Sequence, residues 1–272
     1  MQLDQTRIAI RERGFSEILG LALQVTRAHL LGLTIALVVG VLPFALFNYW
    51  LLSDWAASLW EGDSEEIFGL LSVLVLLLTV EAPFATAPIT LFLGQITFAR
   101  KADPRTIASG LFQALPQLIL LQGFWRTILL GILLLPYWYQ PYLGELILLE
   151  RNPLFGRKRL TTMRRSRNLH SNSGGDLFGR WLLAILAGAV LTVVFSLSVE
   201  ILLMELGSLE VSLTYQLLIV YHGVLWLVFG WMAVVRFLSY LDMRIRHEGW
   251  EVELLMRAEA QRLRRTLGMA GG

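Results

Sequence analysis

The chain has 272 residues, of which 56% are hydrophobic and 16% are charged, and its formal net charge is +2. Its mean hydropathy of +0.60 is well above that of soluble domains of this size, so the bilayer is the expected solvent. The absence of cysteine excludes disulfides and thiolate metal sites, and the regularly alternating segments of a β-barrel are missing.

Residues 1–27 form an amphipathic stretch that we expect in the cytoplasm. The first apolar run starts near residue 28, too late and too long for a cleavable signal, so residues 28–52 are expected to be a retained membrane span. The run ends in Tyr49 and Trp50, aromatic residues of the kind that settle at the headgroup level. An outer loop with acidic and no basic residues follows.

The second apolar run, residues 67–98, is too long for one straight span. It contains Pro83 and Pro88, and each proline removes a helix hydrogen bond and clashes with the preceding turn. The sequence therefore predicts a helix break at these prolines. Residues 99–117 are expected to be a short cytoplasmic connection with an interfacial helix.

Residues 118–149 are long enough for one span or for two short ones. The following segment, 151–180, holds eight basic residues, and a single crossing would place all of them outside. A helical hairpin is therefore favoured. Its return arm is short, and the sequence leaves open whether residues 137–150 cross fully or form a re-entrant segment.

Residues 181–206 and 213–237 are the last two predicted spans. Of the 23 Lys and Arg residues, four precede the first span, three follow the second, eight lie in the basic loop 151–180 and seven lie from Arg236 onward. Only Arg126 is left inside another span, so the positive-inside pattern predicts a multi-pass protein of the bacterial inner membrane with both termini cytoplasmic.

The predicted fold is an all-α integral membrane protein, a bundle of about six transmembrane segments with a short hairpin fourth segment and cytoplasmic amphipathic helices. Three regions follow from this assignment. They are a cytoplasmic N-terminal segment (1–27), a six-segment membrane domain with its basic cytoplasmic loop 151–180 (28–241), and a cytoplasmic amphipathic tail (242–272).

Catalytic motifs are absent from the sequence: it contains no HExxH, GxSxG or P-loop pattern. The four histidines lie in different segments without metal-ligand spacing. We therefore expect neither an enzyme nor a metal or cofactor site.

Two charged residues fall in the middle of predicted spans, Glu81 and Arg126. A charge at the bilayer centre costs about 2.5 to 3.5 kcal/mol, so such residues usually face the protein interior. One interpretation is a polar cavity in which carbonyls freed by Pro83 and Pro88 coordinate a substrate or ion. The other is a structural ion pair between the two residues.

The basic loop offers a second candidate surface, for lipid headgroups or for a partner. Each basic residue near a membrane surface contributes about 1 kcal/mol of attraction to anionic lipid. The residues concerned are Arg157, Lys158, Arg159, Arg164, Arg165 and Arg167. The same charges also fix the orientation of the chain, which by itself explains their presence.

Five short motifs occur in a fixed order along the chain. They are Leu135-Pro136-Tyr137, Pro141-Tyr142-Leu143, Leu148-Leu149-Glu150-Arg151, Asp176-Leu177-Phe178-Gly179-Arg180-Trp181 and Tyr240-Leu241-Asp242-Met243-Arg244-Ile245-Arg246-His247-Glu248-Gly249. This order resembles a bacterial family of six-helix membrane proteins and the membrane domain found beside some glycerophosphodiester phosphodiesterases. The resemblance implies a six-helix membrane domain with cytoplasmic ends. It implies no catalytic residues, because the phosphodiesterase chemistry belongs to a separate soluble domain.

From these observations we expect a non-enzymatic scaffold or a subunit of a membrane complex. The alternative is a small transporter or lipid-handling permease with a polar cavity near Glu81 and Arg126. Membrane lipids are the expected partners. A cytoplasmic or membrane protein partner and an oligomer stay open, and nucleic acid is not expected.

Overall fold

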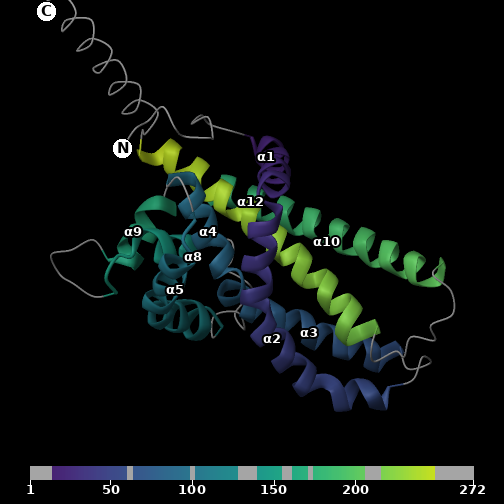
Figure 1. Cartoon of the computed structure of the whole chain (residues 1–272). Helices are drawn as coiled ribbons and strands as arrows, with labels where there is room; N and C mark the ends of the chain where they lie inside the picture. The colour runs from purple at the N-terminus through teal and green to yellow at the C-terminus, as the bar shows by residue number, and fades with distance from the viewer. Residues whose placement is uncertain are drawn as a thin grey trace, which may run out of the picture.

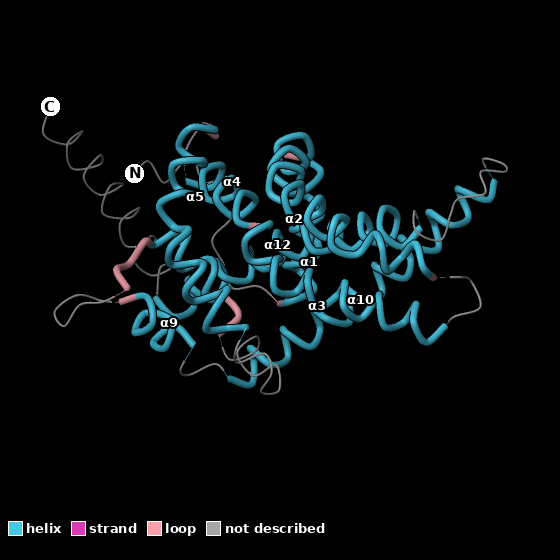
Figure 2. The backbone as a smooth tube through the Cα atoms, turned by 90° about the horizontal axis from the view of Figure 1, so that it is seen from below, coloured by secondary structure: helices cyan, strands magenta, loops and turns pink. Residues whose placement is uncertain are grey.

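The computed structural model describes seven stretches of the chain: residues 14–59, 64–98, 102–127, 140–154, 161–170, 174–205 and 216–248. Within these stretches the chain is helical nearly throughout and contains no strand (Figure 2). The α-helices are α1 (Phe15–Ala28), α2 (Leu30–Ser58), α3 (Ser64–Ala85), α4 (Ala87–Phe98), α5 (Pro104–Leu118), α8 (Leu143–Glu145), α9 (Thr162–His170), α10 (Gly174–Glu205) and α12 (His222–Glu248). Three wider π-helical turns are η2 (Ile119–Trp125), η3 (Leu146–Glu150) and η4 (Gln216–Tyr221).

Five helical stretches of the described chain are long and apolar enough to cross a membrane. They are Leu30–Ser58, Ser64–Thr97, Pro104–Trp125, Gly174–Leu203 and Gln216–Arg246. The all-helical prediction is confirmed, and the apolar helices fit a membrane protein. The predicted return arm of the hairpin falls on α8 and η3, whereas residues 128–139 of that hairpin lie outside the described residues.

α12 is the central helix of the bundle (Figure 1). Both views show α4 and α5 on one side of α12 and α10 on the other, and α1, α2, α4 and α10 all pack against α12 (Figure 2). Figure 1 also shows that α2 and α10 finish, and α3 and η4 begin, at one end of the bundle. The C-terminal end of α12 lies at the opposite end.

Two predicted boundaries fall inside continuous helices. No helix ends at residue 117, because α5 runs on through Pro116 into η2. The second boundary, at residue 242 where the tail was expected to begin, lies inside α12. α12 continues to Glu248, and within this stretch Asp242 is buried against charged partners described below.

The second apolar run divides between the two prolines. α3 ends at Ala85 and α4 begins at Ala87, with Thr86 at the junction. The Thr86 amide still donates to the Ala82 carbonyl oxygen at 2.9 Å, so the chain bends without losing all of its helix hydrogen bonds. Both prolines are buried.

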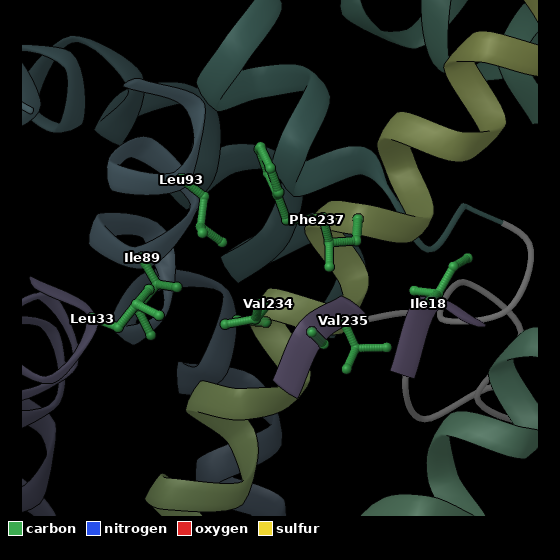
Figure 3. Packing of buried hydrophobic residues seen from close by; sticks show 10 residues of the cluster. Ile18, Leu33, Ile89, Leu93, Val234, Val235 and Phe237 are labelled. Atoms are coloured by element: carbon green, nitrogen blue, oxygen red, sulfur yellow. The ribbon is translucent and has the colours of Figure 1, made fainter. Parts of the chain in front are cut away.

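A cluster of aliphatic and aromatic side chains joins α1, α2, α4 and α12. Figure 3 shows Leu33, Ile89 and Leu93 facing Val234 and Phe237, with Ile18 of α1 beside them. Phe237 and Ile18 are fully buried. Between membrane helices such contacts stabilise chiefly through close packing, since lipid tails are as apolar as these side chains.

The outer faces of α2 and α10 are apolar and exposed. Leu31 of α2 is 76% exposed and Val190 of α10 is 61% exposed, and many large apolar neighbours on both helices are likewise uncovered. A soluble protein rarely exposes apolar surface on this scale. These faces fit hydrocarbon as their solvent.

Gly40 lets α2 pack closely against the junction of α3 and α4. A Cβ atom at this position would overlap the Ala85 carbonyl oxygen and would lie 3.2 Å from the Pro88 side chain. We therefore predict that Gly40→Ala lowers stability by about 1–3 kcal/mol, because backbone atoms cannot move aside cheaply. The measurement is the thermal unfolding midpoint of the purified protein in detergent.

Gly179→Ala on α10 is the matched control, since a Cβ atom there meets nothing within 4 Å. This control is expected to keep or slightly raise the midpoint, as glycine-to-alanine changes in open helix positions do. Equal midpoints for the two variants would contradict the close approach at Gly40.

Candidate functional site

Glu81 and Arg126 are both buried, with exposed fractions of 7% and 4%. They do not form the expected ion pair with each other. Asn48 Nδ2 donates to Glu81 Oε2 at 2.8 Å, and Arg126 Nη1 donates to Gln122 Oε1 at 2.6 Å. Arg126 Nη2 also lies 3.4 Å from the Gln140 carbonyl oxygen.

Instead of pairing with each other, the two residues bind amide side chains of α2 and η2. Glu81 on α3 accepts a hydrogen bond from Asn48 on α2, whereas Arg126 lies one turn after its partner Gln122 on the same helix. Sequence reasoning did not single out Asn48. Its only signal was a lone amide in an otherwise apolar span.

Glu81 belongs to a group of four buried side chains from three helices, called here the Asn48 cluster. Its other members are Asn48, His222 and Trp226, each at most 3% exposed. Trp226 Nε1 donates to His222 Nε2 at 2.8 Å, and Asn48 Nδ2 lies 3.4 Å from the same ring nitrogen. His222 also hydrogen-bonds the Leu218 backbone, so Nδ1 is the nitrogen that carries the proton.

The Asn48 cluster is not fully satisfied within the described chain. Asn48 Oδ1 is buried and accepts no hydrogen bond there. An unpaired buried acceptor costs about 1–3 kcal/mol. The cluster can therefore accept a hydrogen bond from a further donor.

A second buried group lies at the junction of α3 and α4. Arg236 of α12 donates from Nε to Glu145 Oε1 at 2.5 Å, and Glu145 is fully buried. Arg236 Nη2 lies 3.4 Å from the Thr86 hydroxyl oxygen. The basic side chain that contacts the helix junction is thus Arg236, which the sequence assigned to the last span's end, and Arg126 lies elsewhere.

A third group surrounds Glu150 of η3. Arg165 of α9 makes two hydrogen bonds to its carboxylate, from Nε at 2.7 Å and from an Nη at 3.1 Å. The Tyr240 hydroxyl donates to Oε1 at 2.9 Å, and Arg244 Nε lies 3.8 Å away. Burial raises the pKa of the Glu150 carboxyl, but the Arg165 hydrogen bonds and charge outweigh burial, so its pKa lies below the ordinary value.

A fourth group joins α10 to α12. Asp242, 2% exposed, accepts from Arg180 Nη2 at 2.8 Å and from Arg246 Nε at 3.0 Å. Arg180 Nε also lies 3.0 Å from the Asp176 carboxylate. These contacts, with those of Glu150, form what we call the α12 ion-pair network.

The arginines of the basic loop have different surroundings. Arg165 points inward to Glu150, whereas Arg164 and Arg167 are exposed on α9. The remaining residues of the predicted surface, Arg157, Lys158 and Arg159, lie outside the described residues.

An apolar groove lies between α2 and the η4–α12 helix. Its volume is about 530 Å³, and its walls include Leu37, Ala45, Tyr49 and Gly223. His222 and Trp226 belong to the wall as well as to the Asn48 cluster. An apolar groove of this kind fits an acyl chain or another slender apolar molecule.

Among the described residues, no three side chains of His, Cys, Asp or Glu come together in a way that could hold a metal ion. The arrangement instead offers an apolar groove with a buried polar cluster behind one wall. Such a combination suits binding of an amphiphilic molecule, in which one part is apolar and another forms hydrogen bonds.

No family model, curated protein or solved structure matches this chain. Four residues from three of the short sequence motifs lie in the α12 ion-pair network. Glu150 accepts from Tyr240, and Arg180 donates to Asp242, with Tyr240 and Asp242 belonging to the same motif.

We predict that Glu150→Gln lowers stability at neutral pH by about 1–3 kcal/mol, because it removes the charge that Arg165 and Arg244 neutralise. The folded-state pKa of Glu150 lies below its unfolded value. Its contribution is therefore present above the ordinary glutamate pKa of about 4.3 and is lost as the pH falls through the lower folded-state value. Unfolding midpoints measured across acidic and neutral pH test this.

The control variant is Glu65→Gln, an exposed carboxylate at the start of α3. It is expected to leave the midpoint and its pH dependence unchanged. An acid-side pH dependence in Glu150→Gln as steep as in the unmodified protein would show that another group causes it.

Proposed function

We propose that this protein is a non-enzymatic, lipid-handling permease of the bacterial inner membrane, with both termini in the cytoplasm. One observation carries the proposal: the apolar groove between α2 and α12 shares His222 and Trp226 with the buried Asn48 cluster. An amphiphile whose apolar part occupies the groove lies next to hydrogen-bonding groups inside the bundle.

The energetics of the Asn48 cluster support a binding role. Apolar side chains at Asn48 and Glu81 would pack in lipid or protein without needing partners, whereas polar groups at this depth are costly. Within the described part of the chain, moreover, Asn48 Oδ1 has no donor. Polar residues that contribute little to the stability of the bundle are explained better by contact with a ligand than by a structural role.

Two of the polar groups lie one after the other along the bent α3–α4 helix. Glu81 and Thr86 are five residues apart on the bent α3–α4 helix, a rise of about 7.5 Å. Glu81 belongs to the Asn48 cluster, and Thr86 contacts Arg236, which binds Glu145. This spacing supports passage of a polar headgroup between the two groups when the helix junction moves.

A scaffold or complex subunit is the second candidate function. The observation that favours it is the apolar outer face of α10, along which Leu186, Val190 and Val193 are each more than half exposed. A partner helix fits such a face as well as lipid does. Purification in mild detergent separates the two candidates, since a stoichiometric protein partner favours the scaffold and a retained lipid favours the permease.

Lipid binding in the groove can be tested by narrowing the groove. Gly223 lines the groove and a Cβ atom there meets nothing within 4 Å, so Gly223→Leu adds a side chain to the groove wall at an open position. We expect this variant to lose several-fold in cross-linking of a phosphatidylcholine that carries a photoreactive group on its acyl chain. Cross-linked peptides from α2 and α12 are quantified by mass spectrometry after irradiation in liposomes.

Gly179→Leu on α10 is the matched control, because it adds the same side chain at an equally open glycine away from the groove. It is expected to leave cross-linking to α2 and α12 unchanged. Translocation of a fluorescent phospholipid across the same liposomes should fall in Gly223→Leu and in Glu81→Gln. Full translocation and full cross-linking in Gly223→Leu would reject the groove as the binding site.

The proposed sidedness can be tested with single cysteines, since the chain contains none. Ser64→Cys at the start of α3 and Gln140→Cys near the hairpin turn are expected to react with an impermeant reagent from outside. Ser16→Cys on α1 should react only after the membrane is opened. Labelling of Ser16→Cys in sealed cells would invert the proposed orientation.

A further inference from the structure

Helix α9 has one buried face and one basic face. Thr162, Ser166 and Leu169 are buried against the rest of the protein, whereas Arg164 and Arg167 are exposed. This alternation follows the helical repeat, in which residues three and four apart share a face. The exposed face of α9 carries no large apolar side chain.

Contacts on the buried side hold α9 in a fixed position. Arg165 binds both carboxylate oxygens of Glu150, and Glu150 in turn accepts from Tyr240 of α12. The Thr162 hydroxyl donates to the Asn152 carbonyl oxygen at 2.9 Å. Figure 1 shows α9 at the same end of the molecule as the C-terminal end of α12. The two exposed arginines are therefore presented by an anchored helix.

Among the described residues near α9, the carboxylates already have partners. The acidic side chains of the 102–127 and 140–154 stretches are Asp103, Glu145 and Glu150. α12, which also packs against α9, adds Asp242, which binds Arg180 and Arg246. Glu145 and Glu150 are engaged by Arg236 and Arg165, and Asp103 caps the first turn of α5. Hydrogen bonds from Thr106 and Arg105 hold the pKa of Asp103 below its ordinary value.

We propose that Arg164 and Arg167 bind the phosphate groups of anionic phospholipids at the membrane surface. Guanidinium groups match phosphate oxygens with two parallel hydrogen bonds, and this match favours arginine at phosphate sites. The end of α12 beside α9 belongs to a membrane-long helix, so the headgroup layer is the adjacent phase. A protein partner fits less well, because interface cores are rich in apolar side chains and this face has none that are large.

This surface is separate from the groove and does not depend on the proposed permease activity. It also assigns different roles to neighbouring arginines. Arg164 and Arg167 face the lipid phosphate, and Arg165 holds the helix to Glu150. Sequence alone treats the three as equivalent.

The test measures lipid binding to the full chain in a neutral detergent by native mass spectrometry, with phosphatidylglycerol and phosphatidylcholine of the same acyl chains as probes. Each arginine near the surface is expected to contribute about fivefold, so Arg164→Gln with Arg167→Gln should weaken phosphatidylglycerol binding by about 30-fold. Phosphatidylcholine binding should stay unchanged.

Arg27→Gln with Arg105→Gln is the matched control, because it removes the same charge from exposed positions on α1 and α5. It is expected to change phosphatidylglycerol binding by less than about twofold, given the short reach of surface charges. Equal elution volume and unfolding midpoint for both double variants establish that folding is intact.

Three results would overturn the proposal. The first is unchanged phosphatidylglycerol binding in Arg164→Gln with Arg167→Gln. The second is an equal loss in the control, which would indicate attraction by net charge alone. The third is loss of a co-purified acidic protein from the α9 variant while its lipid binding stays the same.

Discussion

The high cost of a charge in a low-dielectric interior is the constraint on which this structure depends. Arg236 and Asp242 lie in the C-terminal half of α12, and Glu150 lies in η3 beside it. Each of the three is held by an oppositely charged side chain from another helix. Removing one partner from such a pair leaves an uncompensated buried charge, which is strongly destabilising. α12 is therefore fixed to its neighbours by charge as much as by shape.

Polar contacts specify positions that apolar packing leaves undefined. Lipid tails solvate Leu and Val as well as a helix does, so apolar faces alone allow membrane helices to slide or rotate. The two hydrogen bonds from Arg165 to Glu150 and the contact of Arg236 with Thr86 each require one register. Close approach at Gly40 adds a steric limit at the junction of α3 and α4.

The wider helical turns lie next to the polar groups. η4 immediately precedes His222, η3 contains Glu150, and η2 immediately precedes Arg126. Widened turns change the direction of side chains and loosen backbone hydrogen bonding, and they are frequent at functional sites. In this chain they accompany the residues that bind across helices. The Asn48 cluster differs from the ion-pair network because its residues His222 and Trp226 also line the apolar groove, which is why we place ligand binding there.

Sequence alone determined the solvent, the helical class and the approximate position of the long apolar helices, because these follow from local composition and from the length needed to cross a bilayer. It also singled out Glu81 and Arg126 as buried charges. Tertiary structure decided their partners, since Asn48 lies 33 residues before Glu81 and no local spacing relates the two.

Contacts between residues far apart in the sequence also explain the other differences between the structure and the sequence-based predictions. The continuation of α12 past residue 242 depends on Arg180, which is 62 residues away from Asp242, and the inward turn of Arg165 depends on Glu150 and Tyr240. Patterns of charge and hydropathy report how a segment meets its solvent. Which arginine faces lipid and which binds a carboxylate is set by contacts between helices, and these exist only in the folded bundle.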